Sequence, residues 1–440
     1  MRVCLSGSRL RPRARSRTSS ETRFRCGEVV GSANLAHRWR AMLRIGLFFG
    51  AARFLFHRAA RRITIHSSCL HAGLSRRRFP SCRQFIGRSA LSSKTLKTID
   101  LFAGIGGIRM GFERAFGDNV ETVFASEFDE HAVKTYAANF DTPAVPCSSK
   151  EPMCTAPYVY GDITQVSAED IPAFDICLAG FPCQAFSIAG SKMGFEDNFK
   201  GRSRGTLFFD VLRICERHKP RVIFCENVKG LVMHDKGRTL KVIRGALEQI
   251  GYTVYDAVLN SKDYGVAQNR ERIYIVAFRN DVDSSSFRFP EPTDAGVVLA
   301  DILEDAPVPS RYYLSDTYLA TLERHKQRHR SRGNGFGYMV RPLDGKSGAI
   351  VCGGMGRERN LIADHREHSM VPTTAIKGKI NDADIRKLTP REWARLQGFP
   401  DSYKLPLSDT HLYKQLGNSV TVPVIEAIAR EVRAVLEAQD

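Results

Sequence analysis

A cysteine and a glutamate each follow a short apolar run with the composition of a buried strand. Cys183 comes after Ile176–Ala179 and a Gly-Phe-Pro break, and Glu226 comes after the run 221–225. Ligands of open α/β sheets bind at the carboxyl ends of the strands, so both side chains can face one site. A thiolate can act there as a nucleophile and a carboxylic acid as a proton donor. Taken singly, such a cysteine more often packs in a core, and such a glutamate more often caps an element or lies on the surface.

A glycine-rich turn earlier in the chain is typical of a cofactor site. We predict a strand at 98–102, a tight turn at 103–107 and a helix at 108–116. Glycines let the backbone approach a ligand closely, and the start of a helix offers unpaired N–H groups. The next predicted strand, 122–126, leads into Glu127, whose carboxylate suits ribose hydroxyls. The turn lacks the full GxGxxG spacing of an NAD site, so these residues alone do not identify the cofactor.

These motifs, taken together, closely resemble those of the cytosine-5 DNA methyltransferases. The matching strings are DLFAGIGGIRMGF from Asp100, FPCQAFS from Phe181, ENV from Glu226 and a Gln-x-Arg-x-Arg pattern at 268–272. The resemblance extends from about Ile99 to Arg430. It implies an α/β protein with a Rossmann-like domain that uses S-adenosyl-L-methionine and a smaller, irregular target-recognition domain. The type is that of bacterial restriction-modification enzymes, which act on double-stranded DNA.

The resemblance also implies a covalent mechanism. A cysteine thiolate adds to carbon 6 of a cytosine that is flipped out of the duplex, an acid assists at ring nitrogen 3, and carbon 5 takes the methyl group. Here the cysteine would be Cys183 and the acid Glu226. Arg272 would fix that carboxylate and bind the carbonyl oxygen of the flipped base, with Arg270 also nearby. No metal is implied.

The residues implied for S-adenosyl-L-methionine lie in the glycine turn, at strand ends, at a helix start and in a motif near the carboxyl terminus. They are Phe102, Gly104, Gly106, Gly107, Glu127, Phe128, Asp162, Ile163, Pro182, Leu207, Asn418 and Ser419. In the family, the residue at Glu127 binds the ribose, the aromatic after it stacks on adenine, and the aspartate faces the adenine amino group.

A basic segment after the cysteine is expected to close over DNA. Residues 192–204 combine lysines and arginines with glycine and serine, and a solvated loop is the plain alternative. We expect Gln184 and Ser187 at its root to help hold the duplex open, and Lys200 and Arg202 to contact phosphates.

The region 279–386 loses the alternation of strands and helices and takes the place of the recognition region. Arg357 and Arg359 are its candidates for guanine contacts, the commonest base-specific contact of arginine. The basic run 324–332 is interpreted as a solvated face. A helix predicted over 388–399 starts with the capping residues Thr389, Pro390 and Glu392 and is given a structural role.

Charge is distributed unevenly along the 440 residues. Residues 1–95 contain 21 of the 65 basic side chains but only two of the 47 acidic ones. The rest of the chain therefore has 44 basic and 45 acidic side chains. The net charge of +18 therefore does not by itself indicate nucleic-acid binding. We interpret 1–95 as a disordered extension or a misassigned start, with an organelle transit peptide as the alternative. The catalytic domain is expected at 96–280 plus 410–440 and the recognition domain at 281–409.

Composition and motifs limit the cellular compartment and the functions that fit this chain. Eleven cysteines without a CxxC pair favour a reducing interior, and no apolar run approaches the roughly 20 residues of a membrane span. We expect a monomer in the bacterial cytoplasm, with a cognate restriction endonuclease as a candidate partner. Three other functions compete: a tRNA cytosine-5 methyltransferase, a catalytically silent DNA-binding regulator and an NAD oxidoreductase. The long recognition region argues against the tRNA enzyme. The full set of reactive residues argues against a silent regulator, and the cysteine loop argues against an NAD oxidoreductase.

Overall fold

The computed structural model describes residues 95–140, 158–182, 207–293, 295–353, 355–366 and 378–439. All of them belong to one compact unit, Gly87–Asp440. Within the described ranges, no helix combines the length and apolar character needed to cross a membrane.

A seven-stranded sheet forms the centre of this unit, with the order β3-β2-β1-β4-β5-β8-β6. The first five strands of this order are parallel, and β8 runs antiparallel to both β5 and β6. The bounds are β1 Leu96–Leu101, β2 Val120–Glu127, β3 Tyr158–Tyr160, β4 Ile176–Ala179, β5 Val222–Val228, β6 Tyr252–Asn260 and β8 Glu271–Arg279.

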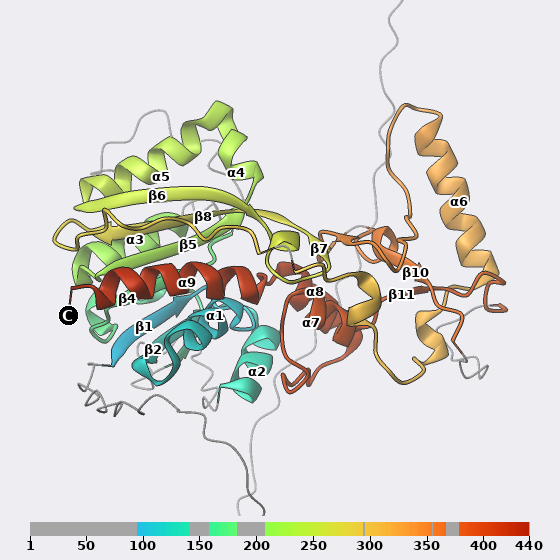
Figure 1. Ribbon diagram of the computed structural model, residues 1–440, viewed down its shortest axis with the longest axis horizontal. Coiled ribbons are helices and arrows are strands. Elements are labelled where there is room, and N and C mark those ends of the chain that lie inside the picture. The colour runs from blue at the N-terminus through green and yellow to red at the C-terminus, as the bar shows by residue number, and fades with distance from the viewer. Residues whose placement is uncertain are drawn as a thin grey trace, which may run out of the picture. The chain divides into compact units, whose positions relative to one another are not determined.

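Helices cover both faces of this sheet, because alternate side chains of a strand point to opposite faces. In β4, Ile176 and Leu178 pack with α1 and α9, whereas Cys177 and Ala179 pack with α3 and α5. Figure 1 shows α9, close to the carboxyl terminus, lying alongside α1. The bounds are α1 Gly107–Phe116, α2 Glu130–Asn139, α3 Leu207–His218, α4 Gly230–Met233, α5 Arg238–Gln249 and α9 Val422–Glu437.

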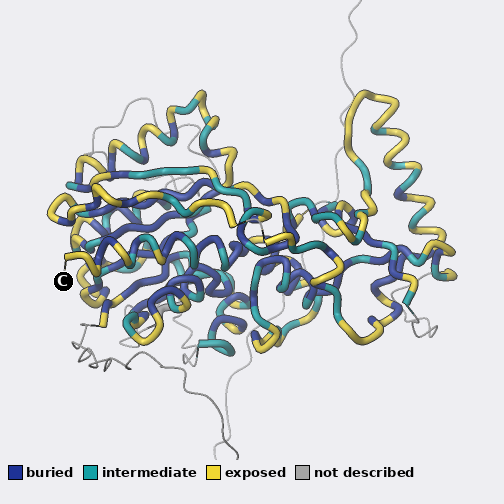
Figure 2. Tube along the Cα trace, viewed as in Figure 1, coloured by how far each residue is buried: buried dark blue, intermediate teal, exposed yellow. Residues whose placement is uncertain are grey.

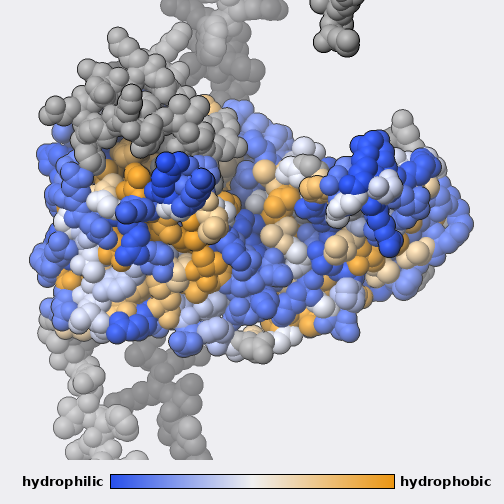
Figure 3. Space-filling model, turned by 90° about the horizontal axis from the view of Figure 1, so that it is seen from above, coloured by the Kyte–Doolittle hydropathy of each residue, from blue (hydrophilic) through white to orange (hydrophobic). Residues whose placement is uncertain are grey.

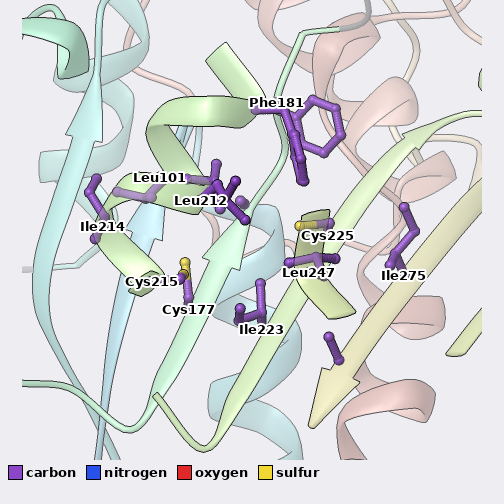
Figure 4. Close-up of a cluster of buried hydrophobic side chains, with 14 of the residues drawn as sticks. Leu101, Cys177, Phe181, Leu212, Ile214, Cys215, Ile223, Cys225, Leu247 and Ile275 are labelled. Carbon is purple, nitrogen blue, oxygen red and sulfur yellow. The ribbon is translucent and has the colours of Figure 1, made fainter. Parts of the chain in front are cut away.

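Three cysteines belong to the core on the α3 and α5 side of the sheet (Figure 4). Cys177 of β4, Cys215 of α3 and Cys225 of β5 are fully buried. Burial is the main cause that raises the pKa of the Cys177 and Cys225 thiols well above the usual value. These two thiols stay neutral, so we treat them as packing residues rather than nucleophiles.

The part of the chain predicted to recognise DNA, with the segments that flank it, is built mainly from short elements. Strand β7 pairs with β9, and β10 forms an antiparallel pair with β11. Two apolar clusters hold it together, one around Trp393 and Leu416 and one around Leu322 and Leu361. The bounds are β7 Gln268–Asn269, β9 Ser347–Gly348, β10 Leu361–Ala363, β11 Ile385–Lys387, α6 Asp316–Arg330, α7 Pro390–Leu396 and α8 Asp409–Asn418.

Short 3-10 turns connect these elements. They lie at Gly117–Asn119, Ile163–Gln165, Ala168–Asp170, His234–Gly237, Ser261–Asp263, Leu299–Ile302, Ser310–Tyr312 and Glu358–Asn360.

The structure confirms the α/β class and most of the predicted elements. The strand at 176–179 has the predicted bounds, and α7 has its capping box between Thr389 and Glu392, although the helix ends at Leu396. Several elements were not predicted, namely α2, α5, β6, α8 and the 15-residue helix α6, whose end contains most of the polar run 324–332. Another difference is that β5 continues through Glu226 to Val228, so Glu226 lies within the strand rather than after it.

Candidate active site

A cavity of about 870 Å³ opens at the carboxyl ends of β1, β2, β4 and β5, the edge at which ligands of such sheets bind. Its lining includes eleven of the twelve residues predicted for the cofactor, and Gly106 is the exception. Glu226, Arg270 and Arg272 line the same cavity. The structure therefore brings the predicted cofactor residues and the predicted proton donor into one space.

The turn after β1 has a backbone that few residues tolerate. Phe102 has φ 57° and Gly104 φ 55°, and a side chain other than glycine is strained in that region. A Cβ on Gly104 would meet no atom within 4 Å. By contrast, a Cβ on Gly106 would lie 2.2 Å from the ring of Phe140, and one on Gly107 would lie 2.8 Å from Val420. Gly106 and Gly107 are thus required by packing within the protein.

Glu127 is tied to this turn by backbone hydrogen bonds. The Gly104 N–H donates to Oε2 at 2.7 Å and the Asp129 N–H donates to Oε1 at 2.7 Å. Burial is the largest cause that raises the pKa of Glu127, and these N–H donors oppose it by favouring the carboxylate. The carboxylate is fixed at the cavity wall, where its remaining lone pairs can accept hydrogen bonds from a ligand.

Other predicted cofactor residues line further parts of the cavity. Phe128 is 74% exposed, so its ring is accessible for stacking. Asp162 caps a short turn, and its Oδ1 accepts from the Thr164 N–H and hydroxyl at 3.0 and 2.7 Å. Pro182 and Leu207 also lie on the lining.

Helix α8 and the residue after it contribute to the cavity from the other end of the chain. Asn418 and Ser419 are on the lining, as predicted, together with Lys414 and Gln415, which were not predicted. Lys414 Nζ lies 2.6 Å from Asp129 Oδ2. No sequence motif indicated this pair, because two polar residues 285 positions apart give no local signal.

Glu226 and Arg272 form an ion pair at the cavity wall. Arg272 Nε lies 3.2 Å from Glu226 Oε1, and the two side chains are 13% and 12% exposed. The pair forms because β5 and β8 are antiparallel neighbours, with Val228 opposite Arg272. Burial is the largest cause that raises the pKa of Glu226, while Arg272 and then Arg270 lower it. The carboxyl group is thus biased toward its protonated form and held by a cation.

Arg270 lines the same cavity and is held by backbone carbonyls. Its guanidinium donates to the backbone carbonyls of Ile350 at 2.7 Å, Gly417 at 3.3 Å and Ser419 at 2.6 Å. Burial is the main cause that lowers the pKa of Arg270, to about 9. Arg270 thus ties the start of β8 to the segment after β9 and to the end of α8, and Arg272 is the arginine paired with Glu226.

The loop that carries the predicted nucleophile is anchored at its described end. Asn227 Nδ2 donates to the Phe181 carbonyl at 2.9 Å, which couples the residue after Glu226 to the residue two positions before Cys183. Cys183, Gln184, Ser187, Lys200 and Arg202 lie outside the described residues. No group of three or more His, Cys, Asp or Glu side chains in the described ranges could hold a metal ion.

The two predicted base readers lie at the short turn Glu358–Asn360 that precedes β10. Arg357 and Arg359 are both exposed. The Arg357 guanidinium lies 5.3 Å from the ring centre of Tyr413, and that of Arg359 lies 5.4 Å from the ring centre of Phe336. Each guanidinium is thus supported by an aromatic ring at the surface, and no carboxylate of the described residues forms an ion pair with either.

Comparisons with known proteins agree with this geometry. The family model for C-5 cytosine-specific DNA methylases matches residues 96–434. Type II methyltransferase M.HpaII of Haemophilus parainfluenzae is 55% identical over 339 residues, which cover 76% of this chain and 88% of the relative. Type II methyltransferase M.NlaX of Neisseria lactamica is 47% identical over 343 residues, which cover 78% and 97%.

The fold is also found among solved structures. The Dnmt2 methyltransferase of S. pombe superposes with a TM-score of 0.56 at 20% identity, covering 78% of this chain and 99% of that one. The family match and the identities decide the assignment. The chain belongs to the C-5 cytosine-specific DNA methylases and is a DNA cytosine-5 methyltransferase.

Proposed function

We propose that the protein transfers a methyl group from S-adenosyl-L-methionine to carbon 5 of a flipped cytosine in a specific duplex site, through a covalent adduct of Cys183. The observation that carries the proposal is the shared cavity, whose lining contains both the predicted cofactor residues and the Glu226–Arg272 pair. A methyl donor and its acceptor must be held together in one space for transfer to be efficient, and this cavity provides such a space.

The cavity residues fit S-adenosyl-L-methionine. The cavity volume of about 870 Å³ is within the roughly 300–1,000 Å³ typical of ligand pockets. Glu127 would accept hydrogen bonds from ribose hydroxyls, Phe128 would stack on adenine, and Asp162 would accept from the adenine amino group. When bound, S-adenosyl-L-methionine supplies an electrophilic methyl group.

The chain's own residues prepare the base for that methyl group. The Cys183 thiolate adds to carbon 6 of cytosine, and the Glu226 carboxylic acid gives its proton toward ring nitrogen 3. Carbon 5 then carries the electron density of an enamine and can take the methyl group. A base then removes the carbon-5 proton, the C5=C6 double bond re-forms as the C6–S bond breaks and the thiolate leaves, and ring nitrogen 3 returns its proton to the Glu226 carboxylate. Arg272 positions Glu226 and donates toward the carbonyl oxygen of the base. We assign Arg270 the role of a positioning residue that acts through Glu226 and Arg272 and does not touch the base.

Methylation of duplex DNA in the presence and absence of S-adenosyl-L-methionine tests the proposal. Bisulfite sequencing reports both activity and site, and tRNA assayed beside the duplex separates the RNA alternative. We expect cytosine-5 methylation within one short sequence, on duplex DNA only and with the methyl donor only. Methylation of tRNA alone, or transfer from another donor, would contradict the proposal.

Sequence specificity is proposed to reside in the recognition domain, 281–409, with Arg357 and Arg359 as base readers. An arginine that contacts guanine through two hydrogen bonds contributes about 1–3 kcal/mol of discrimination. Replacing either arginine with alanine should therefore relax or weaken site choice by roughly 5- to 150-fold, without a change in cofactor affinity. Bisulfite profiles and binding to cognate and random duplexes measure the effect. An unaltered site profile in both variants would remove these arginines as base readers.

Other parts of the proposal follow from the family. Gln184 and Ser187 would hold the duplex open, and Lys200 and Arg202 would contact phosphates. The catalytic domain is proposed as 96–280 plus 410–440, with residues 1–95 dispensable. We propose a monomer that acts in the cytoplasm of a bacterium, because the relatives M.HpaII and M.NlaX are named Type II methyltransferases of bacteria. A restriction endonuclease that cuts the same site is its proposed partner.

A further inference from the structure

Helix α6 is attached to the recognition region along one side only. Leu322 is buried in a cluster with Leu361 of β10 and Ile385 of β11, and Leu319 packs against the same cluster. Most other positions of the helix are exposed (Figure 2). In Figure 1 the helix stands beside the β10–β11 pair, away from the central sheet. The outer side of α6 therefore has no partner among the described elements.

That outer side carries a stripe of arginines. Arg324, Arg328 and Arg332 follow one another at four-residue intervals, which repeat about every 6 Å along one ridge of a helix. Arg324 lies about 200° around the helix from Leu322, opposite the packed side. Arg332 lies in the turn that closes α6, where its N–H donates to the His329 carbonyl. All three are exposed, and the surface at this end is hydrophilic (Figure 3).

The positive charge of this stripe is not neutralised within the described part of the chain. Residues 323–332 contain five lysines and arginines and one acid, Glu323. The Glu323 carboxylate accepts hydrogen bonds from the Tyr338 hydroxyl and from Gln327 at 2.9 Å each. No described carboxylate forms an ion pair with any arginine of the stripe. Like charges at four-residue spacing destabilise a helix, so an anionic partner would offset that cost.

The packed side of α6 leads to the proposed base-reading surface, and the stripe lies on the other side of the same helix. The ring of His329 in α6 lies 5.7 Å from the ring of Phe336, measured between centres. The Arg359 guanidinium lies 5.4 Å from the centre of the same Phe336 ring. A duplex that reaches Arg359 would therefore run close to the last turn of α6.

We propose that Arg324, Arg328 and Arg332 bind phosphates of duplex DNA that flanks the methylated site. The inference rests on the DNA-methylating function and on this surface, and it assigns no base to α6. The three arginines span about 12 Å along α6, and duplex DNA carries one phosphate charge per 3.4 Å of each strand along its axis, so several phosphates lie within reach of this row. Such contacts position the enzyme without reading sequence.

The test is a triple variant, Arg324→Gln, Arg328→Gln and Arg332→Gln, in the full chain. Glutamine keeps a good helix propensity, so the helix should persist. The matched control removes three exposed cations from helices of the catalytic domain, with Arg217→Gln, Lys241→Gln and Arg430→Gln. Binding is measured with long and short duplexes, each with and without the methylated site, at several salt concentrations.

Removal of the α6 stripe should weaken binding to long cognate and long random duplexes by the same factor. The slope of log affinity against log salt should become shallower by about 0.9 for each phosphate that is no longer contacted, up to about 3 for the triple variant and about 1 for Arg328→Gln alone. The weakening should be smaller on a short duplex that ends at the methylated site. The control should keep the parental slope on every duplex.

Three results would overturn the proposal. They are an unaltered salt slope in a folded α6 variant, a weakening confined to the cognate duplex, which would indicate base reading, and an equal weakening in the control variant. Circular dichroism and thermal unfolding establish that both variants are folded. Because methylation by the parental protein is measured in parallel, failure of this inference is distinguishable from failure of the proposed function.

Discussion

Replacing Cys183 with serine should abolish methyl transfer, with a fall in kcat of about a thousandfold or more. A serine hydroxyl is almost fully protonated at neutral pH and is a poor nucleophile without a dedicated base, whereas a thiol supplies thiolate readily. S-adenosyl-L-methionine and DNA should still bind, because the residues proposed to hold them are other side chains. The measurements are single-turnover methylation and separate binding assays for the donor and the duplex.

The same chain offers a matched control. Cys147 lies, like Cys183, outside the described residues and belongs to no motif of the family. Cys147→Ser should methylate DNA at the parental rate. A covalent complex with a cytosine analogue that cannot lose its carbon-5 substituent should form with the parental protein and with Cys147→Ser only. Near-parental turnover by Cys183→Ser would refute the covalent mechanism.

The cavity could be predicted from the sequence because its residues belong to local motifs. A glycine turn after a strand, an acid at the end of the next strand and a glutamate after a further strand are each visible in a short stretch of chain. In the structure, Gly104 and Glu127 meet through a 2.7 Å hydrogen bond, as the carboxyl ends of adjacent parallel strands allow. Gly106 shows the limit of motif-based assignment. It lies in the motif, yet its missing side chain makes room for Phe140 rather than for a ligand.

Arg270 and Arg272 show how far a motif assigns neighbouring residues. The motif assigns Arg272 to the Glu226 carboxylate and places Arg270 only near it. The antiparallel pairing of β5 with β8 places Val228 opposite Arg272 and brings the Arg272 guanidinium to Glu226. Arg270 precedes the strand, and its side chain donates to carbonyls from two distant segments. The partners of Arg270 could not be predicted, because they depend on tertiary packing.

Helix α6 could not be predicted for a different physical reason. Its only buried side chain is Leu322, so the 3.6-residue apolar pattern that predicts helices is almost absent. The helix is nevertheless supported by local signals, since the Ser315 hydroxyl accepts from the Tyr318 N–H and three basic residues lie in its last turn. A polar helix of this kind is indicated by the residues at its ends rather than by its hydropathy.

Glu226→Gln should lower kcat by about 100- to 10,000-fold, the usual contribution of a positioned general acid. The amide can still donate a hydrogen bond toward ring nitrogen 3 but cannot transfer a proton. Burial raises the pKa of Glu226, so its acid form persists at a higher pH than that of an exposed glutamate. Since the reaction needs that acid form, kcat/KM of the parental enzyme should fall as pH rises through this pKa, and the Glu226→Gln variant should lack this fall.

The effect of Arg272 on the pKa of Glu226 predicts the direction in which the pH profile of kcat/KM should shift. Burial is the largest cause of the raised pKa of Glu226, and the positive charge of Arg272 is the larger of the two charges that oppose it. Arg272→Met should therefore move the alkaline fall in kcat/KM to higher pH, while reducing the maximal rate because nothing then positions the carboxyl group and the base. Lys229→Met is the matched control, since Lys229 is a nearby cation that pairs with Glu271 at 2.8 Å and is 56% exposed. It should leave the pH profile in place. A shift to lower pH in Arg272→Met, or an unchanged alkaline fall in Glu226→Gln, would show that another group supplies the proton.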